Sequence, residues 1–305
     1  MKITLDIDQF LDDGRISQEE YDKLKQLSSE TTASLALNIV LAFGVIAVAG
    51  GTIALFQSSS ATVVLGLVLA TIGGFVCATN VRKWMLLGSI LLPLGALTAA
   101  GGIIAATHGR AEGFASVAGL FILGGVVARS GLLVALSVFA LLSALGGATG
   151  YEHAAYFLCI DRPLLTVIVF SLLAVLTHGV GRYMPARYSR LATIFSRTAI
   201  VVTNFGFWVG SLWGDRSSDS SASPWFFIIG WCVILFAAVF WGAVRGFRWL
   251  VNIAAIFGAI HLYTQWFEHF HADPGSIIVA GLLTIAMAYA LISYNWRAKR
   301  HDLAA

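Results

Sequence analysis

Long runs of apolar residues, separated by short polar segments, occupy most of the chain after residue 33. A bilayer core of about 30 Å needs about 20 apolar helical residues, since each residue adds 1.5 Å. Ten uncharged apolar stretches meet or approach that length, and they run near Leu35–Phe56, Ala61–Thr79, Trp84–Thr107, Phe114–Val127, Leu132–Thr149, Leu164–Val180, Ile200–Trp213, Trp225–Val244, Leu250–Phe267 and Ser276–Tyr294. Helices are expected because lipid offers no partner for backbone groups. The pattern predicts an all-α, polytopic transmembrane helix bundle of about ten spans, whose short fourth and seventh segments could be tilted or interfacial.

The composition of the chain excludes an ordinary soluble protein of this length. Hydrophobic residues make up 58% of the 305 residues and charged residues 11%, whereas about 25% charged residues is usual in globular proteins. The first 33 residues hold 12 of the 35 charged side chains, so the rest of the chain is poorer still in charge. The net charge of +3 is too small to indicate a nucleic-acid partner. We therefore expect the lipid bilayer to surround most of residues 34–305.

Basic residues sort to one side of the predicted membrane. With the amino terminus in the cytoplasm, 16 of the 19 Lys and Arg residues lie inside, and only Arg110, Arg162 and Arg216 lie outside. After the leader, acidic residues show the reverse bias. By the positive-inside rule, this distribution predicts a multi-pass protein of the bacterial inner membrane with both termini in the cytoplasm. The longest inside loop carries four arginines that we expect to contact anionic lipid: Arg182, Arg187, Arg190 and Arg197.

Residues 1–33 form a polar leader that differs from the rest of the chain. Apolar residues at helical spacing within Ile3–Leu27 predict two short amphipathic helices, a cytoplasmic helix-turn-helix. Ser17 and Glu20 have the spacing of a capping box, in which each side chain accepts a hydrogen bond from the other residue's backbone amide. The acidic leader lacks the short apolar core of a cleaved signal peptide. Its apolar stripe favours a protein partner or self-association through residues 3–27, or docking on the bundle itself.

The leader also carries a resemblance, in the run FLDDGRISQEEYDKLK from Phe10 to Lys25. This run is similar to short helical modules of the SHOCT type, which have a Gly-x-Ile-Thr/Ser-x-Glu-Glu-Phe/Tyr core. A leader of this kind before a Gly-rich first span resembles uncharacterised bacterial multi-pass membrane proteins of a domain-of-unknown-function family, numbered twenty-one fifty-seven. Outside the leader, the match is one of hydropathy rather than of motifs. The resemblance implies an inner-membrane protein without an established activity, and a module that forms oligomers or contacts a partner.

The two halves of the predicted bundle differ in composition. Residues 34–150 form a Gly-rich five-span half, because 20 of the 31 glycines lie in the first 150 residues. Gly-Gly pairs recur near the carboxyl ends of its spans, at Gly50-Gly51, Gly73-Gly74, Gly101-Gly102, Gly124-Gly125 and Gly146-Gly147. Glycine lets membrane helices approach closely, so these pairs predict tight packing, with hinges as the alternative. Residues 151–305 form an aromatic-rich five-span half with a short basic tail. In it, Trp208 and Trp231 lie deep enough to face neighbouring helices.

Few polar residues lie within the predicted spans, and none of them is Asp, Glu or Lys. Asn204 and His261 fall well inside their spans, and Gln265 follows His261 by four residues on the same helical face. These three residues are the candidates for a solute path. The alternative is structural, with a neutral imidazole and two amides that bond to neighbouring helices.

Imidazole and carboxylate groups gather in the predicted outer loops. The candidates for an outer-face metal or pH-sensing site are His269, His271, Glu268, Asp273 and His153. Such groups bind zinc or titrate near neutral pH, and solvated loop residues are the alternative. No complete metal signature spans the loops, so we predict no metal and no other cofactor. The three cysteines are far apart in apolar surroundings, which favours packing over disulfides.

Sequence motifs do not indicate an enzyme. HExxH, GxSxG, Walker, GxGxxG and paired-cysteine motifs do not occur in the sequence. The leading hypothesis is a non-enzymatic membrane component that acts through partner contact or envelope sensing. The alternative is a carrier for a neutral or weakly polar small solute. A carrier predicts a midplane cavity that reaches Asn204, His261 and Gln265, whereas a closely packed bundle favours the first hypothesis.

Overall fold

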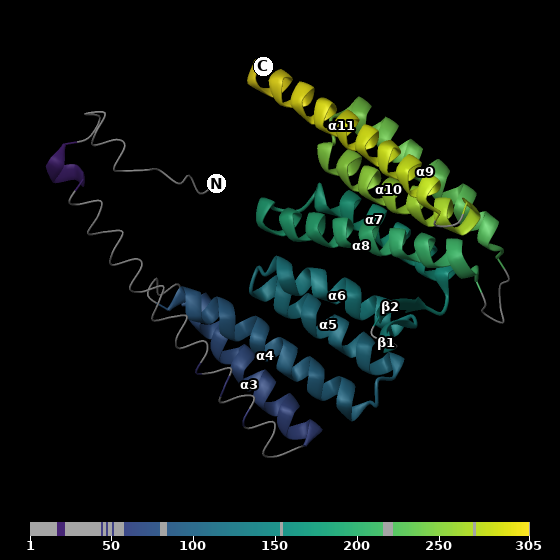
Figure 1. Cartoon of the computed structure of the whole chain (residues 1–305). Helices are drawn as coiled ribbons and strands as arrows, with labels where there is room; N and C mark the ends of the chain where they lie inside the picture. Colours follow the sequence, from purple (N-terminus) through teal and green to yellow (C-terminus); the bar gives the residue numbers. More distant parts are fainter. Residues whose placement is uncertain are drawn as a thin grey trace. The chain divides into compact units, whose positions relative to one another are not determined.

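The computed structural model of the chain describes residues 17–21, 44, 47, 51, 58–79, 84–152, 155–215, 222–270 and 273–304. Within these residues, the labelled elements (Figure 1) are α3 (Ser59–Ala78), α4 (Met85–Ala106), α5 (Ala111–Val127), α6 (Gly131–Ala144), β1 (Gly147–Glu152), β2 (Ala155–Ile160), α7 (Pro163–Gly181), α8 (Ala186–Trp213), α9 (Pro224–Arg245), α10 (Arg248–Phe270) and α11 (Pro274–Ala304). The chain divides into two compact units, Met1–Ser137 (unit 1) and Val138–Ala305 (unit 2). The structure is thus mainly helical, as predicted.

Six helices are long and apolar enough to cross a membrane: α3, α4, α7, α9, α10 and the Pro274–Ser293 part of α11. Helices α5 and α6 are apolar but shorter. Large apolar side chains are exposed along the long helices, for example Phe75 at 69% and Phe236 at 73%. An apolar exterior on apolar helices is expected of a multi-pass membrane protein. The first predicted span, Leu35–Phe56, lies outside the described residues except for three single positions, so ten crossings stay a prediction.

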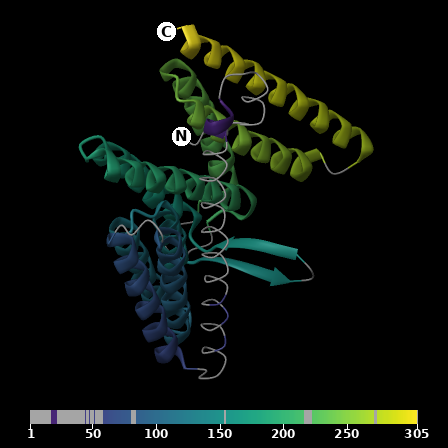
Figure 2. The same cartoon turned by 90° about the vertical axis from the view of Figure 1, so that its left-hand side faces the viewer.

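The fifth predicted span, Leu132–Thr149, was placed too far along the chain, because α6 ends at Ala144 and a β-hairpin follows. Strands β1 and β2 pair antiparallel, with a register that runs from Gly147↔Ile160 to Glu152↔Ala155 (Figure 2). Gly146 ends the helix with a φ of +93°, and a Cβ at this position would lie 2.9 Å from the Asp161 carboxylate. Such a conformation is readily adopted only by glycine. The all-α prediction therefore missed one two-stranded sheet, which hydropathy does not reveal because residues 145–149 carry no charge.

The inside loop from Arg182 to Arg197 was also predicted too long. Helix α8 begins at Ala186, so the connection from α7 is short and Arg187, Arg190 and Arg197 lie on the helix. The sequence prediction began at Ile200 because it excluded charged residues from the span. A helix need not begin where the membrane does, since long arginine side chains can reach the interface from its first turns.

The capping box predicted in the leader is present. The Ser17 backbone amide donates to the Glu20 carboxylate at 2.9 Å, and the Glu20 amide donates to the Ser17 hydroxyl at 3.2 Å. Residues 18–21 are helical after this cap. These bonds satisfy amides that a helix start otherwise leaves without a partner. The rest of the predicted helix-turn-helix lies outside the described residues.

Glycines spaced seven residues apart bring α3 and α4 together in unit 1. Gly66 and Gly73 lie on α3, and Gly88, Gly95 and Gly102 lie on α4; all five are buried. A Cβ on Gly73 would lie 2.5 Å from the backbone nitrogen of Leu92, and one on Gly102 would lie 2.8 Å from that of Val63. Gly66 faces the Ala99 backbone, and Gly95 faces the Ala70 backbone. Both lie closer to that backbone than Gly73 and Gly102 lie to theirs. The two helices therefore meet backbone to backbone, and Figure 1 shows them side by side.

In the pairs Gly73-Gly74, Gly101-Gly102 and Gly124-Gly125, one glycine lies closer to a neighbouring helix than the other. Gly102 faces α3, whereas nothing lies within 4 Å of a Cβ on Gly101. Gly125 would meet the Val134 side chain at 2.7 Å. The tight packing predicted for these pairs is therefore confirmed for Gly73, Gly102 and Gly125. Between α3 and α4, the glycines in close contact follow the seven-residue spacing rather than the pairing.

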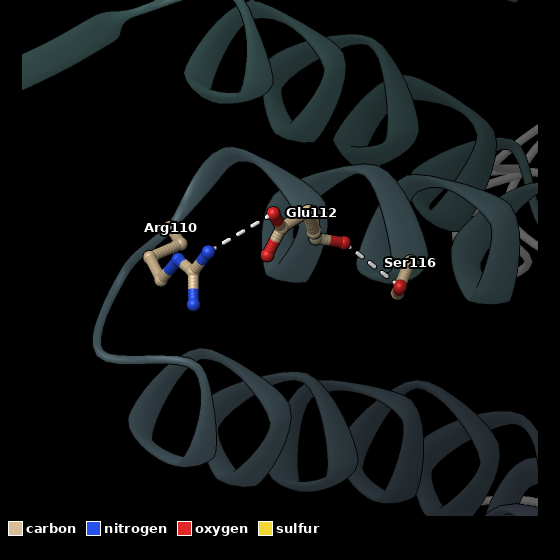
Figure 3. Close-up of polar contacts among 3 residues, drawn as sticks. All are labelled: Arg110, Glu112 and Ser116. Atoms are coloured by element: carbon tan, nitrogen blue, oxygen red, sulfur yellow. Dashed lines mark hydrogen bonds and ion pairs between the residues drawn. The ribbon is translucent and has the colours of Figure 1, made fainter.

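Short-range polar contacts lie at the start of α5, next to the turn from α4 (Figure 3). The Arg110 guanidinium lies 3.2 Å from the Glu112 carboxylate, and the Ser116 hydroxyl donates to the Glu112 carbonyl at 2.8 Å. Glu112 sits in the first turn of α5, where a negative charge complements the helix dipole. Both charged side chains are well exposed, so their pairing adds little to stability.

Helix α8 is the central element of unit 2. It has the largest number of buried residues of the described helices of that unit, from Leu191 to Ser211, and it packs on α7, α9, α10 and β2. Its Ser196 hydroxyl donates to the Ala174 carbonyl of α7 at 2.9 Å. Beyond its last residue, Asp215 is 5% exposed and accepts from the Leu164 amide in the first turn of α7 at 3.1 Å. Side chains of α8 thus reach neighbouring helices at several levels.

Candidate functional site

Trp231 lies at the centre of a buried cluster formed by α8, α9 and α10. Its side chain is fully buried, and its indole N–H donates to the Asn204 side-chain oxygen at 2.9 Å. The His261 ring lies edge-on to Trp231, with 4.7 Å between ring centroids. The Phe207 ring is parallel to that of Trp231, with 6.4 Å between their centroids. We call Asn204, Trp231, His261 and Phe207 the tryptophan cluster. The prediction that Trp208 and Trp231 face neighbouring helices is confirmed, since Trp208 donates to the Thr264 hydroxyl at 3.0 Å.

Two of the three solute-path candidates belong to this cluster. Asn204 uses both ends of its amide, because its nitrogen donates to the Ile200 carbonyl at 2.8 Å while its oxygen accepts from Trp231. His261 is half-buried, and its Nδ1 has no hydrogen-bond partner among the described residues. The structure therefore brings Asn204 and His261 to the same tryptophan. That tryptophan fills the space between them.

Gln265, the third candidate, lies one turn further along α10 and lines a cavity of about 200 Å³. Its walls come from three helices, and the lining residues are Ser211, Leu212, Pro224, Trp225, Ile228, Gln265, Glu268 and His269. The cavity is partly open. It lies where α8 ends, α9 begins and α10 ends, which is the side that the charge distribution predicts to be outside. We call it the outer cavity.

His269 and Glu268, two of the five outer-face candidates, belong to this same cavity. The His269 Nδ1 lies 2.9 Å from the Gln265 carbonyl oxygen. A carbonyl can only accept, so Nδ1 carries a hydrogen and Nε2 has the lone pair in the neutral ring. The Trp225 ring lies beside His269, with 5.6 Å between centroids. The cavity thus combines a carboxylate, an imidazole and an indole.

Of the five outer-face candidates, the other three are not among the described residues that line the outer cavity. Asp273 caps α11, since its carboxylate accepts from the Ser276 amide at 2.8 Å. His153 and His271 lie outside the described residues. Among the residues that are described, no group of three His, Cys, Asp or Glu side chains is placed to hold a metal ion. A metal site at the outer face stays a prediction.

The four arginines predicted to contact anionic lipid lie between the end of α7 and the first turns of α8. Arg182 lies after α7 and donates to His178 Nε2 at 3.2 Å. On α8, Arg187 lies over the Tyr188 ring at 4.8 Å and Arg197 over the Trp249 ring at 4.9 Å. Arg182, Arg187, Arg190 and Arg197 are all exposed. Exposed guanidinium groups beside aromatic rings suit a membrane interface, and lipid contact remains a prediction.

One thiol lies at the base of the hairpin. Cys159 on β2 is exposed, and its Sγ lies 3.6 Å from the Asp161 carboxylate. Partial burial, followed by the bond and the charge of Asp161, raises the pKa of the Cys159 thiol above its ordinary value. A raised pKa keeps the group as an unreactive thiol near neutral pH. This environment does not favour a nucleophilic role.

Sequence reasoning identified Gln265, Glu268 and His269 but did not place them in one site. It assigned Gln265 to a path through the membrane and the other two to a loop, because the predicted span ended at Phe267. Helix α10 continues to Phe270, so all three side chains project from one helix end. It also missed Trp225 and Ser211, which come from other helices and give no signal by spacing.

Comparison with models of known protein families, with curated proteins and with solved structures gave no significant match. The resemblance of the leader to SHOCT-type modules and of the chain to that multi-pass family therefore stays a prediction.

Proposed function

We propose that this chain is a non-enzymatic, multi-pass protein of a bacterial inner membrane, with both termini in the cytoplasm, that senses a small ligand from the outside. The observation that carries the proposal is the position of the outer cavity above the tryptophan cluster. Ile228 and Gln265 line the cavity, and Trp231 and His261 lie one turn deeper on the same two helices. A ligand can therefore enter between α8, α9 and α10, while the next level of these helices is closely packed.

Passage of a solute through unit 2 would require Trp231 to move. Its ring is fully buried between Phe207, Phe257 and His261, and its N–H is bonded to Asn204. Moving it would break that bond in an apolar environment, where the donor finds no water. Binding without passage is the behaviour of a sensor rather than of a carrier.

A cysteine-accessibility experiment tests this function without knowledge of the ligand. Cys77, Cys159 and Cys232 are first replaced by Ala, and a single cysteine is introduced as Gln265→Cys or His261→Cys. In oriented proteoliposomes, we expect a membrane-impermeant thiol reagent to label Gln265→Cys from the outside only. We expect His261→Cys to be labelled from neither side, because Trp231 covers it. Labelling of Gln265→Cys from the inside only would overturn the predicted orientation and the proposal.

The same experiment addresses the carrier hypothesis, which one observation supports. Three buried polar atoms in one stretch of α10 have no partner among the described residues: His261 Nδ1, Gln265 Nε2 and Trp266 Nε1. Buried polar groups are usually bonded, and inside membranes such groups often mark substrate paths. A carrier for a neutral or weakly polar solute would use them when Trp231 moves aside. In that case His261→Cys would react with impermeant reagents from both sides.

Contact with a partner through the leader is a separate part of the proposal. The capping box at Ser17 and Glu20 supports an ordered helix in this segment. Deletion of residues 1–30 should leave the protein inserted in the membrane but remove a partner or self-association that chemical crosslinking detects. If the truncated protein crosslinks like the full chain, the leader does not make that contact.

A further inference from the structure

The chemistry of the outer cavity indicates which ligand it takes. Among the residues that the structure describes, the lining includes the Glu268 carboxylate and no Lys or Arg. A carboxylate in a cavity without a cation repels anions and attracts a positive charge. The ligand class is therefore a cation, or a neutral molecule with several hydrogen-bond donors.

The other polar groups of the cavity also act as acceptors. The Ser211 hydroxyl donates its hydrogen to the Trp208 carbonyl at 2.8 Å, so its oxygen can only accept from a ligand. His269 donates through Nδ1 to the Gln265 carbonyl, which leaves Nε2 as the acceptor of the neutral ring. The Gln265 Nε2 group is a donor, but it is buried away from the surface. The lining thus includes three groups that can accept a hydrogen bond, so a matching ligand carries hydrogen-bond donors.

An aromatic wall strengthens the preference for a cation. Trp225 is 58% exposed in the first turn of α9 and lies beside His269. Among side chains, indole binds a cation over its ring face best. Leu212, Pro224 and Ile228 make the rest of the wall apolar. A ligand with a short apolar group next to its charge fits these surfaces.

We infer that the outer cavity binds a small primary ammonium ion with a short apolar group. Its three N–H donors match Glu268, Ser211 and the His269 Nε2, and its apolar group meets Leu212, Pro224 and Ile228. The cavity volume of about 200 Å³ lies below the roughly 300–1,000 Å³ of pockets for drug-sized ligands, so the ligand has few heavy atoms. A metal ion is less suitable because only Glu268 and His269 could ligate it in this lining. This inference rests on the proposed sensing function.

Calorimetric titration of the full-length protein in nanodiscs tests the inference with n-butylammonium chloride as the probe. We expect saturable binding to the wild-type protein and at least about tenfold weaker binding to Glu268→Gln, which keeps the shape of the side chain and removes its charge. Trp225→Leu should weaken binding several-fold. Glu112→Gln is the matched control, because Glu112 is an exposed carboxylate on α5, outside the lining, and its removal should change nothing.

Three results would overturn the inference. Equal affinity of Glu268→Gln and wild type would show that the carboxylate does not hold the probe. Equal binding of n-butanol would show that charge plays no part, and binding of zinc alone would show a metal site instead. The cysteine-accessibility result distinguishes a failure of the inferred ligand class from a failure of the proposed sensing function. If Gln265→Cys is labelled from the outside but n-butylammonium does not bind, the ligand class is wrong while the sensing function stands.

Discussion

In unit 1 the closest contacts between helices are made where side chains are missing, whereas in unit 2 they are made by the largest side chains of the chain. Gly95 on α4 lies against the Ala70 backbone on α3. Trp231 and Phe227 on α9 are fully buried, and the Phe227 ring lies where a Cβ on Gly210 of α8 would be, at 2.5 Å. Gly210 of unit 2 thus accommodates an aromatic ring, whereas Gly95 of unit 1 accommodates a backbone.

Hydrogen bonds differ between the units in the same way. Among the described residues of α3, α4 and α5, the side-chain hydrogen bonds join residues no more than four positions apart, as in Thr71 to Leu67. Unit 2 also has local bonds of this kind, but some of its side-chain bonds cross between helices, from Trp231 to Asn204 and from Ser196 to Ala174. Contact between backbones depends only on the shapes of the two helices. A hydrogen bond between helices also has a direction, so it favours one neighbouring helix and one alignment with it. Unit 2 is therefore better suited to hold the walls of a binding site in place.

The largest expected effect comes from removing the aromatic centre of unit 2. Trp231→Ala should reduce the free energy of unfolding by about 3–5 kcal/mol, because it leaves a large cavity and removes the hydrogen bond to Asn204. Trp241→Ala is the control on the same helix, since Trp241 is 58% exposed. Equilibrium unfolding in mixed micelles measures both. Equal losses in the two variants would mean that buried aromatics do not hold unit 2 together.

The matching test of unit 1 adds a methyl group instead of removing a ring. Gly95→Ala should destabilise the protein by about 1–3 kcal/mol, because the new Cβ collides with the backbone of α3 and the helices must separate. Gly101→Ala, on the same helix with open space at its Cβ, should be neutral or stabilising by up to about 1 kcal/mol, since alanine favours the helix. The thermal midpoints of the two variants in micelles give the comparison. A Gly95→Ala protein as stable as Gly101→Ala would rule out backbone contact between α3 and α4.

The positions of most helices could be predicted because the bilayer determines the length and the apolar composition of a helix that crosses it. A bilayer requires apolar runs of one length, so Ala61–Thr79 and Trp225–Val244 agree with α3 and α9 within a few residues. The prediction fails where the end of a helix does not coincide with a charged residue. Residues 145–149 are uncharged but form the start of a hairpin, and Arg197 is charged but lies inside α8.

The candidate site could be predicted only in pieces. His261 and Gln265 share a helical face by their spacing, and the structure keeps them on one face of α10. Their neighbours could not be predicted, because Trp231 and Ser211 reach them through helix packing that has no signature in the sequence. The same holds for the glycines of unit 1. Their pairs were visible, but the partner of each glycine depends on how α3 and α4 align.

A smaller effect tests the difference in hydrogen bonding. Ser196→Ala removes a buried bond from α8 to the Ala174 carbonyl of α7 and should cost about 0.6 kcal/mol, the average for such bonds in membranes, and at most about 1.7 kcal/mol. Ser116→Ala is the counterpart in unit 1, because its hydroxyl bonds only to Glu112 four residues earlier and is exposed. We expect its unfolding free energy to stay within error of the wild type. If the two serines matter equally, bonds between helices give unit 2 no special stability.

The smallest effect concerns the leader, where a local polar contact can be switched by pH. The bonds from the Ser17 amide and hydroxyl lower the pKa of Glu20 below its ordinary value. A carboxylate with a lowered pKa stabilises the folded form above its unfolded pKa, and this stabilisation is lost as the pH falls through the lower folded value. The helix start at Ser17 should therefore loosen in acid, below the ordinary glutamate pKa of about 4.3.

The amide resonance of Ser17 in the selectively labelled full-length protein reports this loosening, because that amide donates to the Glu20 carboxylate. In the wild type, we expect its chemical shift to titrate at a pH below the ordinary glutamate value. In Glu20→Gln the titration should disappear, since the amide side chain can still accept a bond but carries no charge. Glu19→Gln leaves the capping box in place and should titrate like the wild type. A Ser17 shift that follows pH equally in all three proteins would show that this contact does not order the leader, and that local bonds in unit 1 are weaker still than the comparison with unit 2 suggests.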